Sequence, residues 1–189
     1  MKPEPAPRTG PDTPRPGEAV EVDPGILWLR FPLPFALDHV NLFALQDGDG
    51  WTLVDTGFGD ETSKGVWLEL LDGPLRARPI RRLVVTHFHP DHVGLAGWLA
   101  ARTGAELLMV ETEWLVARYL CAEAPEAALA TALAFYRAAG VDAARLRALE
   151  ADGHVYPRRI TPPPATFTPL VPGAPLAIGE RRFEVRIGE

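Results

Sequence analysis

The chain has 189 residues, enough for one domain with a substantial apolar core. Hydrophobic residues make up 47% and charged residues 23%, a globular composition that excludes a fibrous or largely disordered protein. The formal net charge of −6 provides no broad basic surface, which weighs against a nucleic acid as the main partner. The single cysteine, Cys121, excludes an internal disulfide.

Membrane and export signals are absent from the sequence pattern. The N-terminal residues lack the apolar core of a signal peptide, and no run approaches the roughly 20 apolar residues of a membrane span. We therefore expect a cytoplasmic protein without a membrane partner.

Residues 1–24 carry a proline every few positions and few large apolar side chains. Such a segment cannot bury enough surface to offset the entropy of ordering it. We expect a disordered tail here and a folded domain over residues 25–189.

Short apolar runs separated by turn residues follow the tail. They predict strands at residues 26–30, 40–46 and 51–55, with glycines in "QDGDG" that suit a hairpin between the last two. A helix is expected over 61–71, because Trp67, Leu70 and Leu71 fall on one face.

The pattern then alternates between strand and helix. The run "RRLVVT" (81–86) predicts a buried strand, 91–104 a helix with Gly104 as its C-cap, and 105–110 another strand. Strands alternating with helices give an α/β fold in which the helices cover one face of the sheet.

Residues 112–150 differ from this pattern, because they hold three alanine-rich helical segments in succession, the last with Asp142 as its N-cap. We expect a helical insertion that acts either as scaffold or as a lid over a substrate. An extended loop over 161–175 and two strands, at 175–178 and 181–187, follow.

The segment "THFHPDH" (86–92) contains three of the five histidines. Side chains two apart in an extended segment point the same way, so His87 and His89 can reach one ion. Asp91 and His92 follow where the chain turns into a helix. Imidazole and carboxylate ligands together suit zinc, or iron or manganese. The alternative is a set of separate surface residues, with Asp91 capping the helix.

Two motifs resemble the metallo-β-lactamase superfamily. "THFHPDH" matches its H-x-H-x-D-H signature, and "LVDTG" (53–57) matches its upstream aspartate motif. The resemblance covers residues 25 to about 110 well and the final strands more loosely. It implies an αββα sandwich, largely its N-terminal half here, with a two-metal site at the edge of the sheets.

The resemblance also implies roles for individual residues. His87 and His89 would bind the first zinc ion, and Asp91 and His92 the second, with Asp91 also orienting the nucleophile. Asp55 would be a carboxylate behind the ligands that orients their loop. The two ions would lower the pKa of a bridging water, and the resulting hydroxide would attack a carbonyl carbon or a phosphorus.

The family site uses more ligands than this motif supplies: a third histidine in a G-H-[ST] turn, a bridging aspartate and a last histidine. Only His39 and His154 remain, and the final residues, "RRFEVRIGE", resemble the strand before that turn. We favour a sequence that lacks the C-terminal part of the domain, with His154 as third ligand as the alternative. We expect this chain alone to bind metal weakly and to have little activity.

The segments 33–45 and 47–60 resemble bacterial glyoxalase-II-like and lactamase-B-like hydrolases. They imply a small-molecule substrate, an ester or thioester such as hydroxyacylglutathione. Three alternatives stay open: a metal-dependent ribonuclease of the same superfamily, a mononuclear iron enzyme related to persulfide dioxygenases, and an inactive binding domain. The sequence holds no signature of the oligomeric state.

Overall fold

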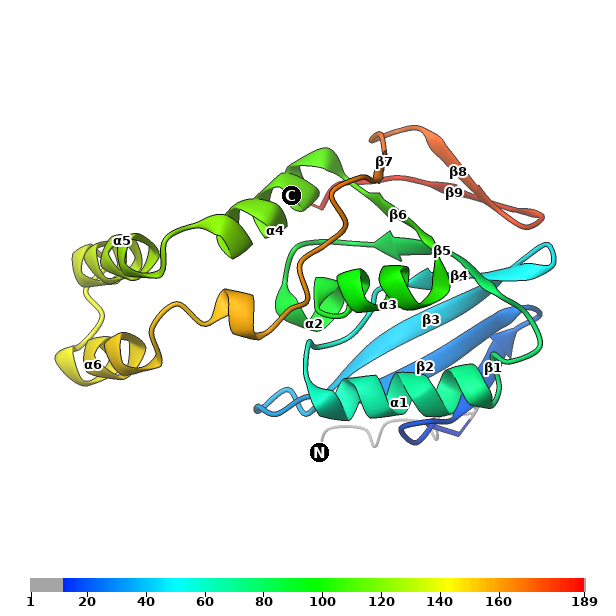
Figure 1. Ribbon diagram of the computed structural model, residues 1–189, viewed down its shortest axis with the longest axis horizontal. Helices are drawn as coiled ribbons and strands as arrows, with labels where there is room; N and C mark the ends of the chain where they lie inside the picture. Colours follow the sequence, from blue (N-terminus) through cyan, green and yellow to red (C-terminus); the bar gives the residue numbers. More distant parts are fainter. Residues whose placement is uncertain (1–11, 189) are drawn as a thin grey trace, which may run out of the picture.

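The computed structural model describes residues 12–188 (Figure 1). In chain order its elements are β1 (Ala19–Asp23), β2 (Ile26–Pro32), β3 (His39–Asp47), β4 (Gly50–Val54), α1 (Glu61–Asp72), β5 (Ile80–Val85), α2 (Pro90–Val93), α3 (Ala96–Thr103), β6 (Glu106–Met109), α4 (Glu111–Ala122), α5 (Pro125–Ala138), α6 (Ala143–Asp152), the 3₁₀ helix η1 (Tyr156–Arg158), β7 (Thr168–Pro169), β8 (Pro175–Ile178) and β9 (Arg181–Glu184). Within these described residues no helix is both long and apolar enough to cross a membrane.

The centre of the fold is a seven-stranded sheet whose strands lie in chain order, β1 to β7. The strands from β1 to β4 are antiparallel, and those from β4 to β7 are parallel. The carboxyl ends of β4 and β5 therefore meet at one edge of the sheet, which is where an open α/β sheet builds its functional loops.

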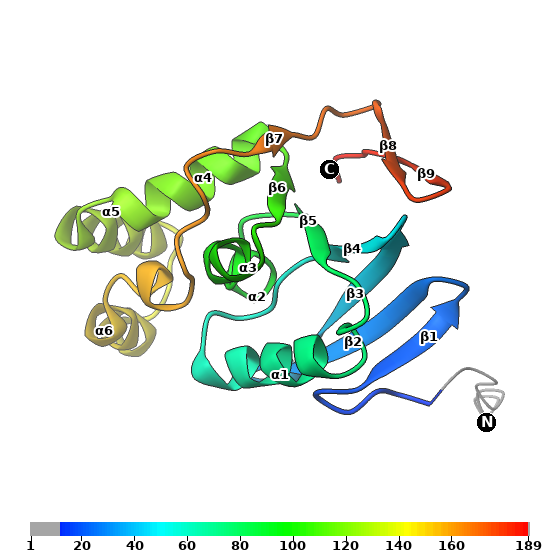
Figure 2. The same cartoon turned by 45° about the vertical axis from the view of Figure 1, so that its right-hand side comes forward.

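Layers cover both faces of this sheet. Helices α1, α2 and α3 lie on one face, and the hairpin of β8 and β9 lies on the other (Figure 2). The predicted α/β fold with helices on one sheet face is thus confirmed. A strand buried on both faces needs apolar residues at consecutive positions, and the sequence "LVV" (83–85) of β5 provides them.

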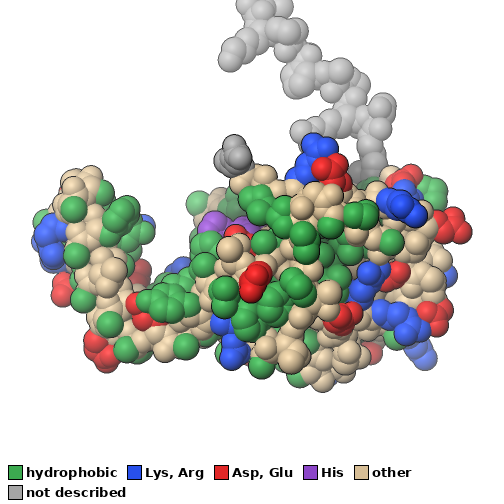
Figure 3. Space-filling model, turned by 90° about the horizontal axis from the view of Figure 1, so that it is seen from above, with side chains coloured by type: hydrophobic (Ala, Val, Ile, Leu, Met, Phe, Trp, Pro, Cys, Tyr) green, Lys and Arg blue, Asp and Glu red, His purple; other side chains and the backbone are tan. Residues whose placement is uncertain are grey.

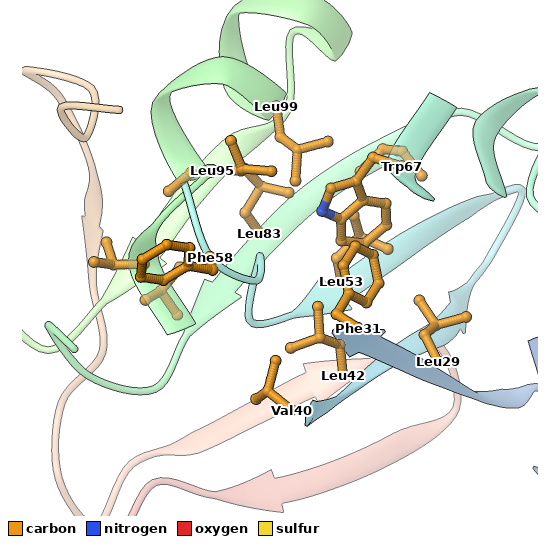
Figure 4. Packing of buried hydrophobic residues seen from close by; sticks show 14 of the residues in the cluster. Leu29, Phe31, Val40, Leu42, Leu53, Phe58, Trp67, Leu83, Leu95 and Leu99 are labelled. Carbon is orange, nitrogen blue, oxygen red and sulfur yellow. The ribbon is translucent and has the colours of Figure 1, made fainter. Parts of the chain in front are cut away.

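The main core lies between the sheet and the helices. Trp67 of α1 packs over the sheet side chains Phe31 and Leu53, and all three residues are fully buried (Figure 4). The indole Nε1 of Trp67 donates to the carbonyl oxygen of Thr56 at 2.8 Å, which satisfies its polar atom and fixes the loop after β4. Each such buried apolar side chain stabilises the fold by roughly 1.5–3 kcal/mol.

The predicted tail ends earlier than expected. Ala19–Asp23, inside the segment 1–24, forms β1 and pairs antiparallel with β2, with Ala19 opposite Leu29. This strand has no buried residue, so main-chain hydrogen bonds to β2 order it, and these leave no hydrophobic signal in the sequence. Residues 1–11 of the predicted tail lie outside the described residues.

Two further boundaries differ from the prediction. The helix expected over 91–104 is two helices, α2 and α3, separated at Gly94 and Leu95. A short strand, β7, lies within the expected loop 161–175, where it pairs with β6. The C-cap at Gly104 is confirmed, because that residue has a left-handed φ of 73° and its N–H bonds to the carbonyl of Ala100.

The three helices predicted within 112–150 are confirmed as α4, α5 and α6. Helix α4 leaves the body, and α5 and α6 form a pair that projects from it (Figure 1). Ala128 is the buried residue of α5, and α6 has none between Ala143 and Asp152. We call α4, α5 and α6 the helical arm.

Candidate metal centre

The predicted ligands come together at the sheet edge where β4 and β5 end. His87 and His89 follow β5, and Asp91 and His92 lie in the short helix α2. The loop after β4, which contains Asp55, lies beside them, because Asp55 N donates to the carbonyl oxygen of Val84 at 2.8 Å.

The first pair of donors is His87 and His89. The Nε2 atom of His87 lies 3.1 Å from the Nδ1 atom of His89, and the ring centroids are 4.6 Å apart. Two nitrogen ligands at about 2.0–2.1 Å from a tetrahedral zinc ion lie roughly 3.3 Å from each other. The separation of these two nitrogens therefore fits a single zinc ion.

The second pair is Asp91 and His92. The Oδ2 atom of Asp91 lies 3.4 Å from the Nε2 atom of His92, again close to the separation of two ligands of one ion. The rings of His87 and His92 have centroids 4.1 Å apart, so the two pairs are neighbours. The donors thus fit two adjacent ions.

Asp55 determines which ring nitrogen of His92 could bind a metal ion. Its side chain is 7% exposed, and its Oδ2 atom lies 2.8 Å from Nδ1 of His92. A carboxylate only accepts, so Nδ1 carries the proton, and in the neutral ring the lone pair that could bind metal is on Nε2. Asp55 also accepts hydrogen bonds from the main-chain N–H and the hydroxyl of Thr86, at 2.8 and 2.9 Å.

The same interactions shift the pKa values of the histidines in opposite directions. Burial lowers the pKa of His92, but the hydrogen bond to Asp55 and the charges of Asp55 and Asp91 outweigh it, so the net shift is upward. Burial lowers the pKa of His87, and the neighbouring His92 and His89 lower it further. His87 is therefore neutral near pH 7, as a metal ligand must be.

Thr56 joins the two motif loops. Its N–H and its hydroxyl both donate to the carbonyl oxygen of His92, at 2.8 and 2.7 Å, and its hydroxyl accepts from Leu95 N at 3.2 Å. Neither Thr56 nor Thr86 was expected at the site, although both stand inside the quoted motifs. The Thr56 hydroxyl bonds the main chain and the Thr86 hydroxyl bonds the carboxylate of Asp55, and neither contact leaves a spacing pattern by which it could be recognised.

The other two histidines take part in different contacts. His39 Nδ1 lies 3.0 Å from the guanidinium of Arg30 and next to Asp38, at the start of β3. His154 Nε2 donates to the carbonyl oxygen of Leu120 at 2.8 Å, at the base of the helical arm. Within residues 12–188 no group of three or more His, Cys, Asp or Glu side chains could hold an ion, so each pair stands without a third donor.

The cluster is open to the outside. Asp91 and His92 have side chains that are 18% and 23% exposed. In the space-filling view, histidine side chains reach the surface of the body on the side that faces the helical arm (Figure 3). A small molecule could reach the donors from this side.

Comparison with known proteins adds evidence about the family of this chain. Residues 36–176 match the sequence model of the metallo-beta-lactamase superfamily, which is most of the chain. A curated relative, described as a probable metallo-hydrolase, YqjP of Bacillus subtilis (strain 168), is 32% identical over 71 residues. These residues are 37% of this chain and 22% of the relative.

Two solved structures are similar over nearly all of the chain. A beta-lactamase domain protein from Burkholderia ambifaria is 34% identical with a TM-score of 0.74, over 92% of this chain and 50% of that protein. The metallo-beta-lactamase family protein TTHA1429 from Thermus thermophilus is 27% identical with a TM-score of 0.69, over 88% and 52%. The chain thus spans about half the length of these two proteins.

Proposed function

The chain belongs to the metallo-beta-lactamase superfamily, and we propose that it contributes the histidine cluster of a metal-dependent hydrolase. The observation that carries the proposal is the pair of donor sets, His87 with His89 and Asp91 with His92, whose donor atoms are 3.1 and 3.4 Å apart. The similarity to a protein described as a probable metallo-hydrolase supports the same reaction class.

The four donor residues would bind two separate ions. His87 and His89 would hold one zinc ion, and Asp91 and His92 the other. When bound, the ions supply Lewis acidity, which activates water near neutral pH and stabilises negative charge on a substrate oxygen.

The chain's own polar groups prepare this site. Asp55 keeps the proton of His92 on Nδ1 and so leaves Nε2 free to bind. The carboxylate of Asp91 can also accept a hydrogen bond from the attacking water and so orient it. Thr56 holds the main chain of His92 in place through the two hydrogen bonds to its carbonyl oxygen.

We further propose a small ester or thioester as substrate, with hydroxyacylglutathione as the first compound to test. The resemblance of segments 33–45 and 47–60 to glyoxalase-II-like hydrolases supports this choice. The open position of the donors supports a small molecule, and the net charge of −6 weighs against RNA.

The test is hydrolysis of a hydroxyacylglutathione thioester by the chain in excess zinc, beside the double variant His87→Ala/His89→Ala. We expect slow turnover that depends on zinc and is lost in the double variant. Equal rates in the two proteins would overturn the proposal. Metal-dependent cleavage of RNA without thioester turnover would indicate a nuclease instead of a thioester hydrolase. Bound iron together with oxygen uptake would indicate an iron oxygenase.

A further inference from the structure

The two ends of the helical arm meet at one residue of the ligand loop, Phe88, which stands between His87 and His89. Glu113 lies in the first turn of α4, where the arm begins. Tyr156 opens η1, just after the arm ends. Both side chains reach back over 25 and 68 residues of sequence to the main chain of Phe88.

Their hydrogen bonds satisfy both polar groups of Phe88. The N–H of Phe88 donates to Oε2 of Glu113 at 2.9 Å, and its carbonyl oxygen accepts from the hydroxyl of Tyr156 at 2.6 Å. Strand β5 ends at Val85, so Phe88 lies beyond the sheet ladder that would otherwise pair these groups. The orientation of this residue therefore depends on the arm.

Tyr156 is built into this position rather than resting on the surface. It is 9% exposed and belongs to the main core, with its ring 6.4 Å from that of Phe88, which in turn lies 4.8 Å from the ring of His89. Burial raises the pKa of Tyr156, and nearby Cys121 and Glu113 raise it further, so its hydroxyl stays protonated and remains a donor.

Further contacts join the two sides of the base of the arm. His154 donates from Nε2 to the carbonyl oxygen of Leu120 in α4, 2.8 Å away. From the same helix, the Nε1 of Trp114 donates to the carbonyl oxygen of Pro164 at 3.0 Å, and Arg118 donates to that of Pro163 at 3.1 Å. Helix α4 and the returning segment are thus joined to each other, and the two bonds to Phe88 come from these joined segments.

We propose that Glu113 and Tyr156 are positioning residues, which clamp the main chain of Phe88 and thereby hold the rings of His87 and His89 at the spacing that one metal ion needs. The proposal rests on the proposed function for its metal, but the clamp itself is a property of the metal-free chain. It also assigns the base of the helical arm a role in the site, beyond that of scaffold.

The first experiment is amide hydrogen exchange on the metal-free chain, read at Phe88. Glu113→Ala removes the acceptor of the Phe88 N–H, and we expect its exchange to accelerate about tenfold or more. Tyr156→Phe keeps the ring and removes only the hydroxyl, and we expect about fivefold. Exchange within about twofold of the unmodified chain in both variants would overturn the clamp.

Matched variants separate positioning from general destabilisation. Glu113→Gln keeps an oxygen acceptor and should restore the protection of the Phe88 amide. Tyr119→Phe removes a different hydroxyl, that of Tyr119 in α4, which bonds to Glu123 on the exposed side, and should leave the exchange of Phe88 unchanged. Faster exchange at Phe88 in Tyr119→Phe, to the same degree as in Tyr156→Phe, would contradict a specific role.

The second experiment measures Co²⁺ affinity by competition with a chromophoric chelator. Residues that support metal ligands typically contribute about 10–100-fold to metal affinity. Glu113→Ala and Tyr156→Phe should therefore each bind Co²⁺ about tenfold more weakly than the unmodified chain. Glu113→Gln and Tyr119→Phe should bind Co²⁺ with the affinity of the unmodified chain. Unchanged Co²⁺ affinity together with faster exchange would overturn the link to the metal. If the unmodified chain binds no Co²⁺, the metal-binding role proposed for this chain fails, while the exchange data still decide whether the clamp exists.

Discussion

Asp55 acts on the metal site through the proton of His92, and an asparagine at this position tests that role. The amide nitrogen of Asn would face Nδ1 of His92 and donate to it, which moves the ring proton to Nε2. Nε2 would then be unable to bind metal. We predict that Asp55→Asn weakens Zn²⁺ binding by about 10–100-fold, measured by competition with a chelator.

The same substitution should leave the fold nearly intact. Asp55 has a left-handed φ of 64°, a conformation that asparagine tolerates, and the amide oxygen can still accept from the N–H of Thr86. We expect the free energy of unfolding to fall by only about 1 kcal/mol or less. Asp23→Asn, which alters an exposed ion pair with Arg181, is the control. Wild-type zinc affinity in Asp55→Asn would contradict the assigned tautomer of His92.

Gly94 allows the two motif loops to pack closely. A Cβ atom at this position would lie 2.5 Å from the main-chain nitrogen of Gly59 and closer still to the carbonyl oxygen of Gly57. Main-chain atoms cannot rotate away as a side chain would, so Gly94→Ala should lower the free energy of unfolding by roughly 2–3 kcal/mol in urea denaturation.

Gly65 provides the opposite result within the same protein. It lies in α1 with no atom near its would-be Cβ, so Gly65→Ala should stabilise the chain by up to about 1 kcal/mol through helix propensity. Destabilisation by both substitutions, to a similar extent, would show that the close approach at Gly94 is not the cause.

A partly buried network of charged side chains helps to attach the hairpin of β8 and β9 to the large sheet. Asp47 accepts from Gly179 N at 2.9 Å and pairs with Arg82 at 2.6 Å, and Arg82 donates to the carbonyl oxygen of Ala177 at 2.8 Å. The two charged side chains are 18% and 22% exposed. We predict that Asp47→Ala lowers the free energy of unfolding by about 2 kcal/mol at pH 7, measured by urea denaturation.

This difference should depend on pH with a definite sign. Burial raises the pKa of Asp47, but hydrogen bonds from Gly179, Thr52 and Arg82 outweigh it, so the pKa is lower in the folded state than in the unfolded state. The stabilisation is therefore present above the unfolded pKa of about 3.9 and is lost as the pH falls through the folded pKa. If the free energies of unfolding of Asp47→Ala and the unmodified chain differed as much in strong acid as at pH 7, this charged network would be excluded as the cause.

Elements whose signal is local could be predicted from the sequence. The strand at 51–55 was predicted from a short apolar run between turn residues, and the helix at 61–71 from apolar residues that fall on one helical face. Strand β1 was missed because it has no buried residue and is ordered by its partner. The break between α2 and α3 was missed because the contacts made there, of Gly94 with the loop at Gly57 and of its carbonyl oxygen with Thr161, join distant parts of the chain.

The candidate site shows the same division. His87, His89, Asp91 and His92 could be proposed from one heptapeptide, and the structure brings these four side chains together. Glu113 and Tyr156, which bond to Phe88, could not be proposed from the sequence. Their hydrogen bonds span 25 and 68 residues and form only when the helical arm folds back. Contacts of that kind have no sequence periodicity.

At the level of the whole molecule, the number of donors limits how tightly this chain can hold metal. Residues 12–188 supply two side-chain donors to each proposed ion and no group of three. Catalytic zinc sites typically use three protein ligands and a water. The chain spans about half the length of its two similar solved structures, so the affinity of this chain alone is a separate question from the activity of a longer protein.

We therefore predict that the purified 189-residue chain keeps fewer than two zinc ions after dialysis, measured by elemental analysis beside His87→Ala/His89→Ala. Two ions per chain that survive dialysis and are lost in the double variant would contradict this, because each ion would then need a further donor from the chain. His39→Ala and His154→Ala would identify it: the loss of one ion in either variant would mean that His39 leaves Arg30, or His154 leaves Leu120, when metal binds.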